Sequence, residues 1–590
     1  MTKTLYVDKR TGTFADQLTA FGLARLAQDV LRRVHDDREL TVTLRDRGPY
    51  YELALDAPLD DATLDRFEGG YMPIKVLLTK KSESKLPAEM NRAYCVFYEA
   101  ERDRRAAYFE QRNNLSSEAK EAQKKGVEHP ELLQLRENEP HPDWDIFRAI
   151  NPAALLGYNK LVRQWWQVQP SLAPVLRLIR DLYMVSPNDL RRAESDWKAL
   201  DKEMGWGIDA LATSGQIYSP AMGKGQNRTK ANKLTMGNVK GLWLSEFLSA
   251  VGYYQAAHTR NPRGTKDRKT YVLAPTDLRL SDHYPVFAAF QRAMQASETT
   301  IRSDVFAMLR YTQELLGYAV SDQGGSVLSV LLQTGSPNRL VAGFGSALYK
   351  NLGNAVATMN LPFMGLPGWL CVQNRDDVET ALNILREHER VVRGFDESHS
   401  DDVGLLLQYR NFCSGDNIEA FLRFTGLYSA FVISQREKSR YAHQFTTTNL
   451  GRLLMNSEPK LEPILESEGF QNIAYAIRQS TVTAQYKRRN LNDRRYEVRY
   501  GLGQQLLRKA HHADTFVAEL SEFMLKYNAE NAQVMENRQG PYRKSLRTSD
   551  IDEIVALIDA FGPETVCGLL VAYGYARVPR DENVEAIQEQ

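Results

Sequence analysis

The fold is decided first by residues 13–34, which read TFADQLTAFGLARLAQDVLRRV. Apolar residues recur there at helical spacing, at Phe14, Leu18, Phe21, Leu26, Val30 and Val34. Thr13 precedes the first of them and can cap a helix, with Asp16 three residues later as a short form of the capping box. The stretch therefore predicts one long helix with a buried face.

Two alternating segments follow this helix. Residues 40–45 and 50–55 alternate in polarity, and Arg47-Gly48-Pro49 stands between them as a turn. This arrangement predicts a β-hairpin. We therefore expect the N-terminal region to mix helices and strands.

A highly charged stretch runs over residues 99–140. It is dense in Glu, Lys, Arg and Gln, so we interpret it as a solvated helical excursion, with a partner-binding arm as the functional alternative. Helical patterns return over residues 150–206 together with several tryptophans. We interpret these tryptophans as core residues rather than as platforms for stacking bases.

The chain beyond residue 400 is helical in pattern almost throughout. Residues 394–403 are polar and acidic, and we interpret them as a linker. We therefore predict the α+β class, with a large mixed α/β region over residues 1–400 that carries the excursion at about 99–140. A C-terminal α-helical bundle is predicted over residues 401–590.

The composition is that of an ordinary globular protein, with 590 residues of which 43% are hydrophobic and 25% are charged. Four widely separated cysteines give no disulfide framework and no Cys-rich zinc site, so we expect a reduced, cytoplasmic protein. The first residues show no apolar stretch behind a basic region, and no run of about 18 apolar residues occurs. We therefore expect neither a signal peptide nor a membrane span.

The linear signatures of common enzymes are missing from the sequence. Gly223-Lys224-Gly225-Gln226 does not fit the phosphate-binding loop of nucleotide hydrolases. His511 and His512 would point about 100° apart on a helix, so they cannot easily share one metal ion. No His-Glu-x-x-His, nucleophile elbow or Gly-Gly-Asp-Asp motif is found. We therefore predict no catalytic residue, no metal site, no cofactor and a role without catalysis.

Positive charge is concentrated in two segments, although the whole chain carries only +1. Residues 210–270 contain ten basic and two acidic residues, which gives +8, and residues 485–510 contain eight basic and two acidic residues, which gives +6. The remainder of the chain carries −13. Two such segments favour a nucleic-acid partner. Solvated loops or an acidic protein partner are the alternatives.

The first basic segment has the character of a loop that contacts nucleic acid. Gly223, Gly225 and Gly237 interrupt it, and Asn and Gln alternate with the cations. Lys and Arg hold phosphates, whereas Asn and Gln can hydrogen-bond to base edges. The predicted DNA-binding residues are Lys224, Gln226, Asn227, Arg228, Lys230, Asn232, Lys233, Lys240, Arg263, Lys266, Arg268 and Lys269.

The second basic segment lies between predicted helices and mixes arginine with Tyr486, Tyr496 and Tyr500. This mixture suits a track for a sugar-phosphate backbone with base stacking on the tyrosines. The predicted track residues are Lys487, Arg488, Arg489, Arg494, Arg495 and Arg499.

With these features in view, the chain resembles the large subunit of a type I CRISPR Cascade surveillance complex. The resemblance is carried by YVDKRTGTFADQLTAFGLARL at residues 6–26, by IAYAIRQSTVTAQYKRR at residues 473–489 and by RRYEVRYGLG at residues 494–503. The chain length fits, as does a mixed N-terminal region followed by a helical bundle that is similar to the small subunits of these complexes.

The resemblance implies a non-catalytic role in antiviral defence or in directing a transposon. In such complexes the guide RNA reads the target by pairing, while the large subunit recognises the motif flanking the target duplex and stabilises strand separation in the R-loop. The implied partners are the guide RNA, target double-stranded DNA, the backbone and small subunits, and a recruited helicase-nuclease or other effector, with no membrane.

Two other function classes stay open. One is a nucleic-acid-processing enzyme, such as a nuclease or a modification enzyme, with scattered catalytic residues. The other is a scaffold that binds only proteins and whose basic segments meet acidic partners.

Overall fold

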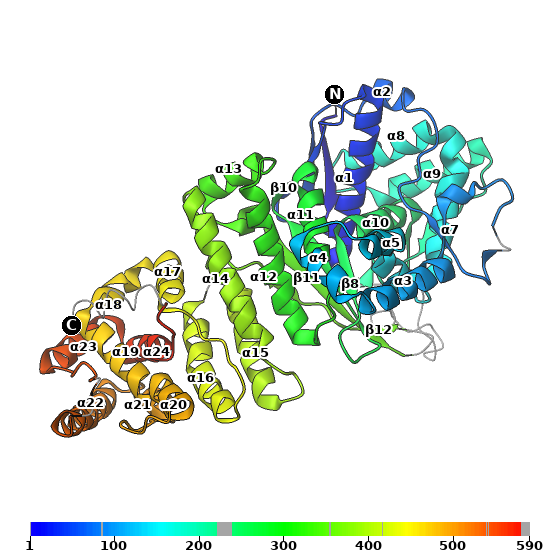
Figure 1. The fold of residues 1–590 in the computed structure, drawn as a ribbon. Coiled ribbons are helices and arrows are strands. Elements are labelled where there is room, and N and C mark those ends of the chain that lie inside the picture. The colour runs from blue at the N-terminus through cyan, green and yellow to red at the C-terminus, as the bar shows by residue number, and fades with distance from the viewer. Residues whose placement is uncertain are drawn as a thin grey trace, which may run out of the picture. The chain divides into compact units, whose positions relative to one another are not determined.

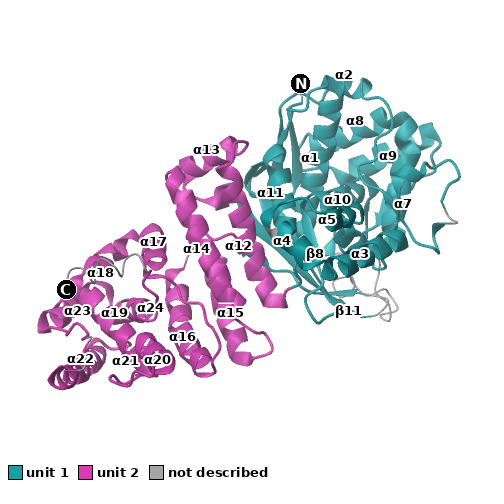
Figure 2. Cartoon of the chain, in the orientation of Figure 1, with its two compact units in different colours: residues 1–297, 340–364 teal, residues 298–339, 365–590 magenta. Residues whose placement is uncertain are grey.

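A computed structural model gives the fold (Figure 1) and describes residues 2–579, apart from residues 84–85, 221–238, 353–355, 416, 539 and 541. The chain forms two compact units (Figure 2), of which unit 1 comprises Met1–Ser297 and Leu340–Met364. Unit 2 comprises Glu298–Arg339 and Gly365–Gln590. Unit 1 mixes helices and strands and unit 2 is helical, so the predicted α+β class is confirmed.

Two antiparallel sheets organise unit 1. The first has the order β1-β3-β2-β10 and consists of β1 (Thr4–Asp8), β2 (Val42–Asp46), β3 (Tyr50–Leu55) and β10 (Asp277–Arg279). The second has the order β12-β11-β9-β8, with β13 paired to β11. Its strands are β8 (Ala257–Arg260), β9 (Arg268–Pro275), β11 (Val341–Asn351), β12 (Val356–Asn360) and β13 (Phe363–Gly365).

The described part of unit 1 also contains two short strand pairs and eleven α-helices. The parallel pair is β4 (Val76–Leu78) with β5 (Cys95–Phe97), and the antiparallel pair is β6 (Leu211–Thr213) with β7 (Lys240–Leu242). The helices are α1 (Phe14–His35), α2 (Asp61–Asp65), α3 (Tyr98–Asn113), α4 (Ser117–Lys125), α5 (Pro130–Glu137), α6 (Trp144–Ile150), α7 (Leu155–Val168), α8 (Leu172–Tyr183), α9 (Leu190–Met204), α10 (Trp243–Ala256) and α11 (Leu280–Ala293).

The sequence features of unit 1 correspond to local structure in most places. The predicted hairpin is β2–β3, with Val42 opposite Leu55 and Gly48 in the left-handed region at φ 86°. The charged excursion corresponds to α3–α5, which share a small core of Leu115, Ala119 and Leu135. The tryptophans Trp165 and Trp197 are buried, as expected for core residues.

The helix predicted over residues 13–34 is α1. The Thr13 side chain accepts a hydrogen bond from the Ala15 N–H, so the predicted cap is present. The predicted capping box is wrong, because the Asp16 carboxylate instead accepts hydrogen bonds from the N–H and the hydroxyl of Thr11. Asp16 therefore fixes the loop that precedes the helix.

Helix α1 crosses α10 with backbone against backbone. A Cβ atom added to Gly22 would lie 1.9 Å from the carbonyl oxygen of Leu248, and one added to Gly252 would lie 1.8 Å from that of Leu18. The hydroxyls of Thr19 and Ser249, 2.8 Å apart, link the same two helices. Only glycine permits such an approach, since any side chain would occupy the space of the opposing carbonyl.

Unit 2 contains the remaining α-helices. They are α12 (Thr300–Ala319), α13 (Gly325–Thr334), α14 (Arg375–Arg393), α15 (Ser400–Cys413), α16 (Ile418–Glu437), α17 (Thr447–Ser457), α18 (Glu462–Glu466), α19 (Glu468–Ser480), α20 (Val482–Asn490), α21 (Leu502–Lys509), α22 (Ala513–Glu536), α23 (Thr548–Phe561) and α24 (Pro563–Gly574). A buried aromatic cluster lies around His388, whose Nδ1 is 2.7 Å from the Tyr409 hydroxyl.

The predicted boundary at residue 400 differs from the division between the units, because helices α12–α14 belong to unit 2. The segment interpreted as a linker is a packed connection within that unit. Phe395 in it is buried, and the Glu397 carboxylate accepts hydrogen bonds from the N–H groups of Ile301 and Arg302 at the start of α12. At least one acidic residue of this segment, Glu397, therefore caps the N-terminus of α12.

The close crossing of α1 and α10 predicts a large effect of one methyl group. We expect Gly22→Ala to lower the free energy of unfolding of unit 1 by about 3 kcal/mol or more, the upper part of the range for overpacking. Denaturation monitored by intrinsic fluorescence would measure the change.

The matched control is Gly157→Ala in α7, where an added Cβ would meet no atom nearer than 4.0 Å. This variant should be stabilised by up to about 1 kcal/mol through helix propensity. Equal stability of Gly22→Ala and the unsubstituted chain would contradict the described crossing.

Candidate nucleic-acid interface

The first basic segment is described only in part. The predicted DNA-binding residues Lys224, Gln226, Asn227, Arg228, Lys230, Asn232 and Lys233 lie outside the described residues. The structure describes the residues on both sides of them, together with Lys240, Arg263, Lys266, Arg268 and Lys269.

A buried carboxylate anchors the residues that precede positions 221–238. Glu246, in the first turn of α10, lies 2.7 Å from the Ser214 hydroxyl and 3.4 Å from the Ser219 hydroxyl. Burial raises the pKa of the Glu246 carboxyl. On the other side, β6 pairs with β7, which opens with the exposed Lys240.

Gln216, which lies between these two serines in the chain, contacts the end of the second sheet. The Tyr349 hydroxyl of β11 donates to the carbonyl of Gln216 at 3.1 Å, and the Gln216 amide donates to the Thr358 hydroxyl of β12 at 3.1 Å. Gln216 therefore lies beside the strands β11 and β12.

The turn between β8 and β9 presents two cations at this sheet. The Asn261 amide donates to the carbonyls of Lys266 and Asp267 at 3.1 and 2.8 Å, and Gly264 adopts φ 78°, which closes a tight turn. The side chains of Arg263 and Lys266 are exposed and form no hydrogen bond or ion pair with any described residue. Both remain open to a phosphate.

Lys269 is buried in unit 1 and Arg268 is half-buried, and their positions do not favour the predicted DNA contact. The Arg268 guanidinium donates to the carbonyls of Arg148 and Ala149 at 2.6 and 2.7 Å, which closes the C-terminal end of α6. Burial lowers the pKa of Arg268. Lys269 is buried, with its ammonium 5.8 Å from the centre of the Tyr271 ring.

Strand pairing adds a residue that the sequence did not indicate. Lys350, near the end of β11, lies 3.5 Å from Asp267, the residue that follows Lys266. The pairing of β9 with β11 brings these residues together from positions far apart in the chain. We call Arg263, Lys266 and Lys350 the basic edge of unit 1.

The second basic segment divides into an inward and an outward set. Arg495 forms an ion pair with Asp493 at 2.7 Å, and hydrogen bonding from Arg495 lowers the pKa of Asp493 to about 2. Arg499, only 12% exposed in its side chain, contacts Glu530 of α22 at 2.5 Å. These two arginines stabilise unit 2.

One of the tyrosines of the second basic segment packs inside unit 2 and is not available to stack on a base. Tyr496 is buried, and the Arg543 guanidinium lies 3.6 Å from the centre of its ring. Arg543 also contacts Glu530 at 2.9 Å, so this carboxylate joins two arginines. The stacking partner of Tyr496 is therefore a side chain of unit 2.

The outward set lies at the C-terminal ends of α16 and α20 and in the segments that follow them. The two helices are side by side (Figure 1), and a hydrogen bond from Arg489 to the Ser439 hydroxyl joins their ends. Burial lowers the pKa of Lys487, which is half-buried. The exposed cations, which we call the basic face of unit 2, are Lys438, Arg440, Arg488, Arg489 and Arg494.

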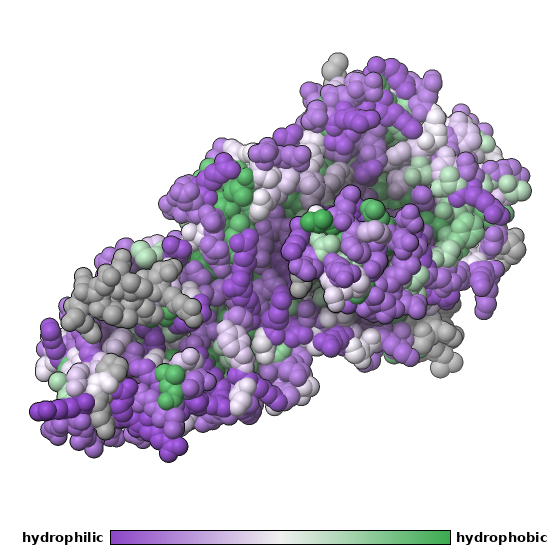
Figure 3. All heavy atoms as spheres, in the orientation of Figure 1, coloured by the Kyte–Doolittle hydropathy of each residue, from purple (hydrophilic) through white to green (hydrophobic). Residues whose placement is uncertain are grey.

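Two exposed tyrosines accompany this face. Tyr441 is 76% and Tyr486 is 54% exposed, and Figure 3 shows mostly hydrophilic side chains around the ends of α16 and α20. Lys438 and Arg440 were not among the predicted track residues, although cations stand at alternate positions from Arg436 to Arg440 in the sequence. The exposed cations of this face therefore differ from the predicted track residues, because Lys438 and Arg440 are added whereas Arg495 and Arg499 face inward.

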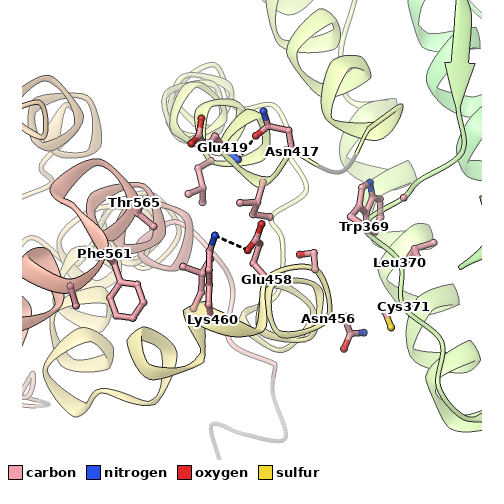
Figure 4. A pocket seen from close by; sticks show the side chains of 16 residues that line it. Trp369, Leu370, Cys371, Asn417, Glu419, Asn456, Glu458, Lys460, Phe561 and Thr565 are labelled. Carbon is pink, nitrogen blue, oxygen red and sulfur yellow. Dashed lines mark hydrogen bonds and ion pairs between the residues drawn. The ribbon is translucent and has the colours of Figure 1, made fainter. Parts of the chain in front are cut away.

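Unit 2 also contains a cavity of about 810 Å³ between the start of α16, the end of α17 and the end of α23 (Figure 4). Its charged lining residues are Glu419, Glu458 and Lys460, of which Glu458 and Lys460 form an ion pair at 3.1 Å. No histidine lines it. This lining offers no nucleophile paired with a base.

Metal-ligating clusters and membrane-spanning helices are both missing from the described part of the chain. It contains no group of three or more His, Cys, Asp or Glu side chains placed to hold a metal ion. None of its helices combines the length and the apolarity needed to cross a membrane.

No protein-family model matches the chain, and no curated protein matches it.

The division of the second segment into two sets predicts different costs of substitution. We expect Arg499→Ala to lower the free energy of unfolding by about 2 kcal/mol, because Glu530 loses a charged hydrogen-bond partner. Arg494→Ala is the matched control and should change it by less than about 0.5 kcal/mol. Chemical denaturation measures both, and a neutral Arg499→Ala would contradict the inward assignment.

Proposed function

We propose that this chain is a non-catalytic large subunit of a CRISPR RNA-guided DNA surveillance complex. Its role is to recognise the motif that flanks the target duplex and to stabilise strand separation. Its partners are the guide RNA, the target double-stranded DNA, the backbone and small subunits, and a recruited effector such as a helicase-nuclease. The proposal implies a cytoplasmic protein.

The observation that supports the proposal is the placement of exposed cations in two surfaces. On the basic edge of unit 1, Arg263 and Lys266 form no ion pair with described residues, and they belong to the same +8 stretch as residues 221–238. Lysine and arginine side chains of this kind neutralise phosphates and release counterions. The edge fits contact with a duplex backbone, while Asn and Gln at 226, 227 and 232 are the candidates for reading base edges.

The basic face of unit 2 supports the second part of the role. It combines five cations with the exposed rings of Tyr441 and Tyr486. Every base has a flat face that can stack on such a ring, so a combination of this kind suits a separated strand without regard to its sequence. This face is the proposed track for the displaced strand.

The basic segment is tested by a fourfold substitution, Lys224→Ala, Arg228→Ala, Lys230→Ala and Lys233→Ala. We expect weaker binding of all duplex sequences and a salt dependence whose slope falls by about one for each phosphate that the variant no longer neutralises. Filter binding at several salt concentrations would measure both quantities.

The matched control removes four cations elsewhere, by Lys125→Ala, Lys198→Ala, Arg423→Ala and Lys526→Ala. Each of these residues is exposed and pairs with a glutamate one helical turn away. The control should keep most of the affinity although its net charge falls equally. Equal decreases in the two variants would show that net charge alone governs binding.

The proposal also predicts that the purified chain neither cleaves DNA nor hydrolyses nucleotides. The physical reason is that no convergent catalytic or metal-ligating set was found in the sequence or among the described residues. Incubation of labelled DNA and of nucleotides with magnesium or manganese would measure this. Cleavage that survives stringent purification and disappears on substitution of acidic residues of this chain would favour an enzyme instead.

A further inference from the structure

A cavity of about 570 Å³ opens in unit 1 between β4, the residues that follow it, and the start of α7. The volume lies within the range of about 300–1,000 Å³ that is typical of ligand sites, whose walls are mostly apolar. The apolar lining residues are Val76, Leu78, Leu86, Pro152, Leu155 and Leu156. The cavity therefore suits a large apolar group.

Two walls of this cavity are joined by a buried side chain. Asn159 of α7, which also lines the cavity, accepts a hydrogen bond from the Leu77 N–H at 3.0 Å and donates one to the Leu77 carbonyl at 2.8 Å. These two bonds hold α7 against β4, so the walls that the two elements contribute keep a fixed separation. A preformed site of this kind loses less conformational entropy on binding than one that must first be ordered.

One apolar wall continues onto the outer surface. Leu156 lines the cavity and is 78% exposed, the largest fraction among the exposed large apolar side chains of the described residues. A ligand small enough to be enclosed by the cavity would leave Leu156 in water. A ligand that covers this side chain must extend beyond the cavity, as a peptide does.

The lining of the cavity also carries positive charge. Lys80 and Lys81 are exposed, and their side chains form no hydrogen bond or ion pair with any described residue. Arg163 is the third lining cation, and Glu99, which accepts a hydrogen bond from the Lys80 N–H at 3.2 Å, is the one acid in the described lining. Three cations against one carboxylate leave a charge of +2, which attracts an acidic ligand.

We propose that this cavity binds an acidic peptide segment of a partner protein. The peptide places one large apolar side chain between the walls, covers Leu156 with its neighbouring residues, and brings its carboxylates to Lys80 and Lys81. A nucleic-acid strand fits less well, because no aromatic ring of the described lining offers a base a surface for stacking. The inference does not depend on the proposed function, which includes protein partners but assigns them no contact.

The test selects peptides from a random phage-displayed library on the immobilised full chain. We expect the enriched peptides to share a large apolar residue flanked by aspartate or glutamate. A fluorescein-labelled copy of one of them should bind the chain in fluorescence anisotropy, and Leu156→Ser should weaken that binding about tenfold, the lower end of the effect of losing one buried leucine side chain. Thermal unfolding should be unchanged, because Leu156 is exposed.

The matched control is Leu133→Ser, which changes another exposed leucine of unit 1 that does not line the cavity and should leave peptide binding unchanged. The charge is tested by the double variant Lys80→Glu and Lys81→Glu. It should bind the acidic peptide more weakly at low salt, and it should bind a peptide whose acidic residues are replaced by lysine more tightly than the unsubstituted chain does.

Four results would overturn the proposal. The first is a library that enriches no such peptide, and the second is equal peptide binding by Leu156→Ser and Leu133→Ser. The third is weaker binding of duplex DNA by Leu156→Ser than by Leu133→Ser, which would assign the cavity to nucleic acid. The fourth is binding of phosphatidylglycerol vesicles that Leu156→Ser abolishes, which would assign this surface to a membrane.

Discussion

The backbone contact between α1 and α10 is the constraint on which unit 1 depends. Gly22 and Gly252 each face a carbonyl oxygen of the opposing helix at a distance that excludes any side chain. Helix α1 also contacts strands of both larger sheets directly. Helix α10 in turn carries Glu246, which holds Ser214 and Ser219 before positions 221–238. One packing contact thus positions the helix that holds the residues preceding positions 221–238.

Local features of this fold could be predicted from the sequence, and long-range pairings could not. The periodicity of residues 13–34 predicts α1, and the alternation around Gly48 predicts the hairpin β2–β3. The pairing of β10 with β2 joins residues more than two hundred positions apart, and nothing in the two short segments indicates it. The boundary expected at residue 400 differs from the unit division because polar residues such as Glu397 serve as helix caps there.

The same limit applies to the candidate interface, where the sequence gives the number of basic residues but not the direction in which they face. Counting charges locates two basic segments, but a count cannot separate arginines that close helix ends from those that face outward. Arg268 and Arg499 use several N–H donors on carbonyls and carboxylates of their own unit, a role that the planar guanidinium suits well. Lys350 becomes part of the basic edge of unit 1 only because β9 pairs with β11. Arg440 becomes part of the basic face of unit 2 only because the hydrogen bond between Arg489 and Ser439 joins the two segments.

The central claim is that nucleic acid meets this chain at these two basic surfaces. Photocrosslinking of the full chain to DNA that carries 5-iododeoxyuridine, followed by mass spectrometry of the peptides, tests it most directly. We predict crosslinks within residues 214–240 and 261–267 of unit 1 and at Tyr441 or Tyr486 of unit 2. Crosslinks confined to other surfaces, or none at low salt, would contradict the account.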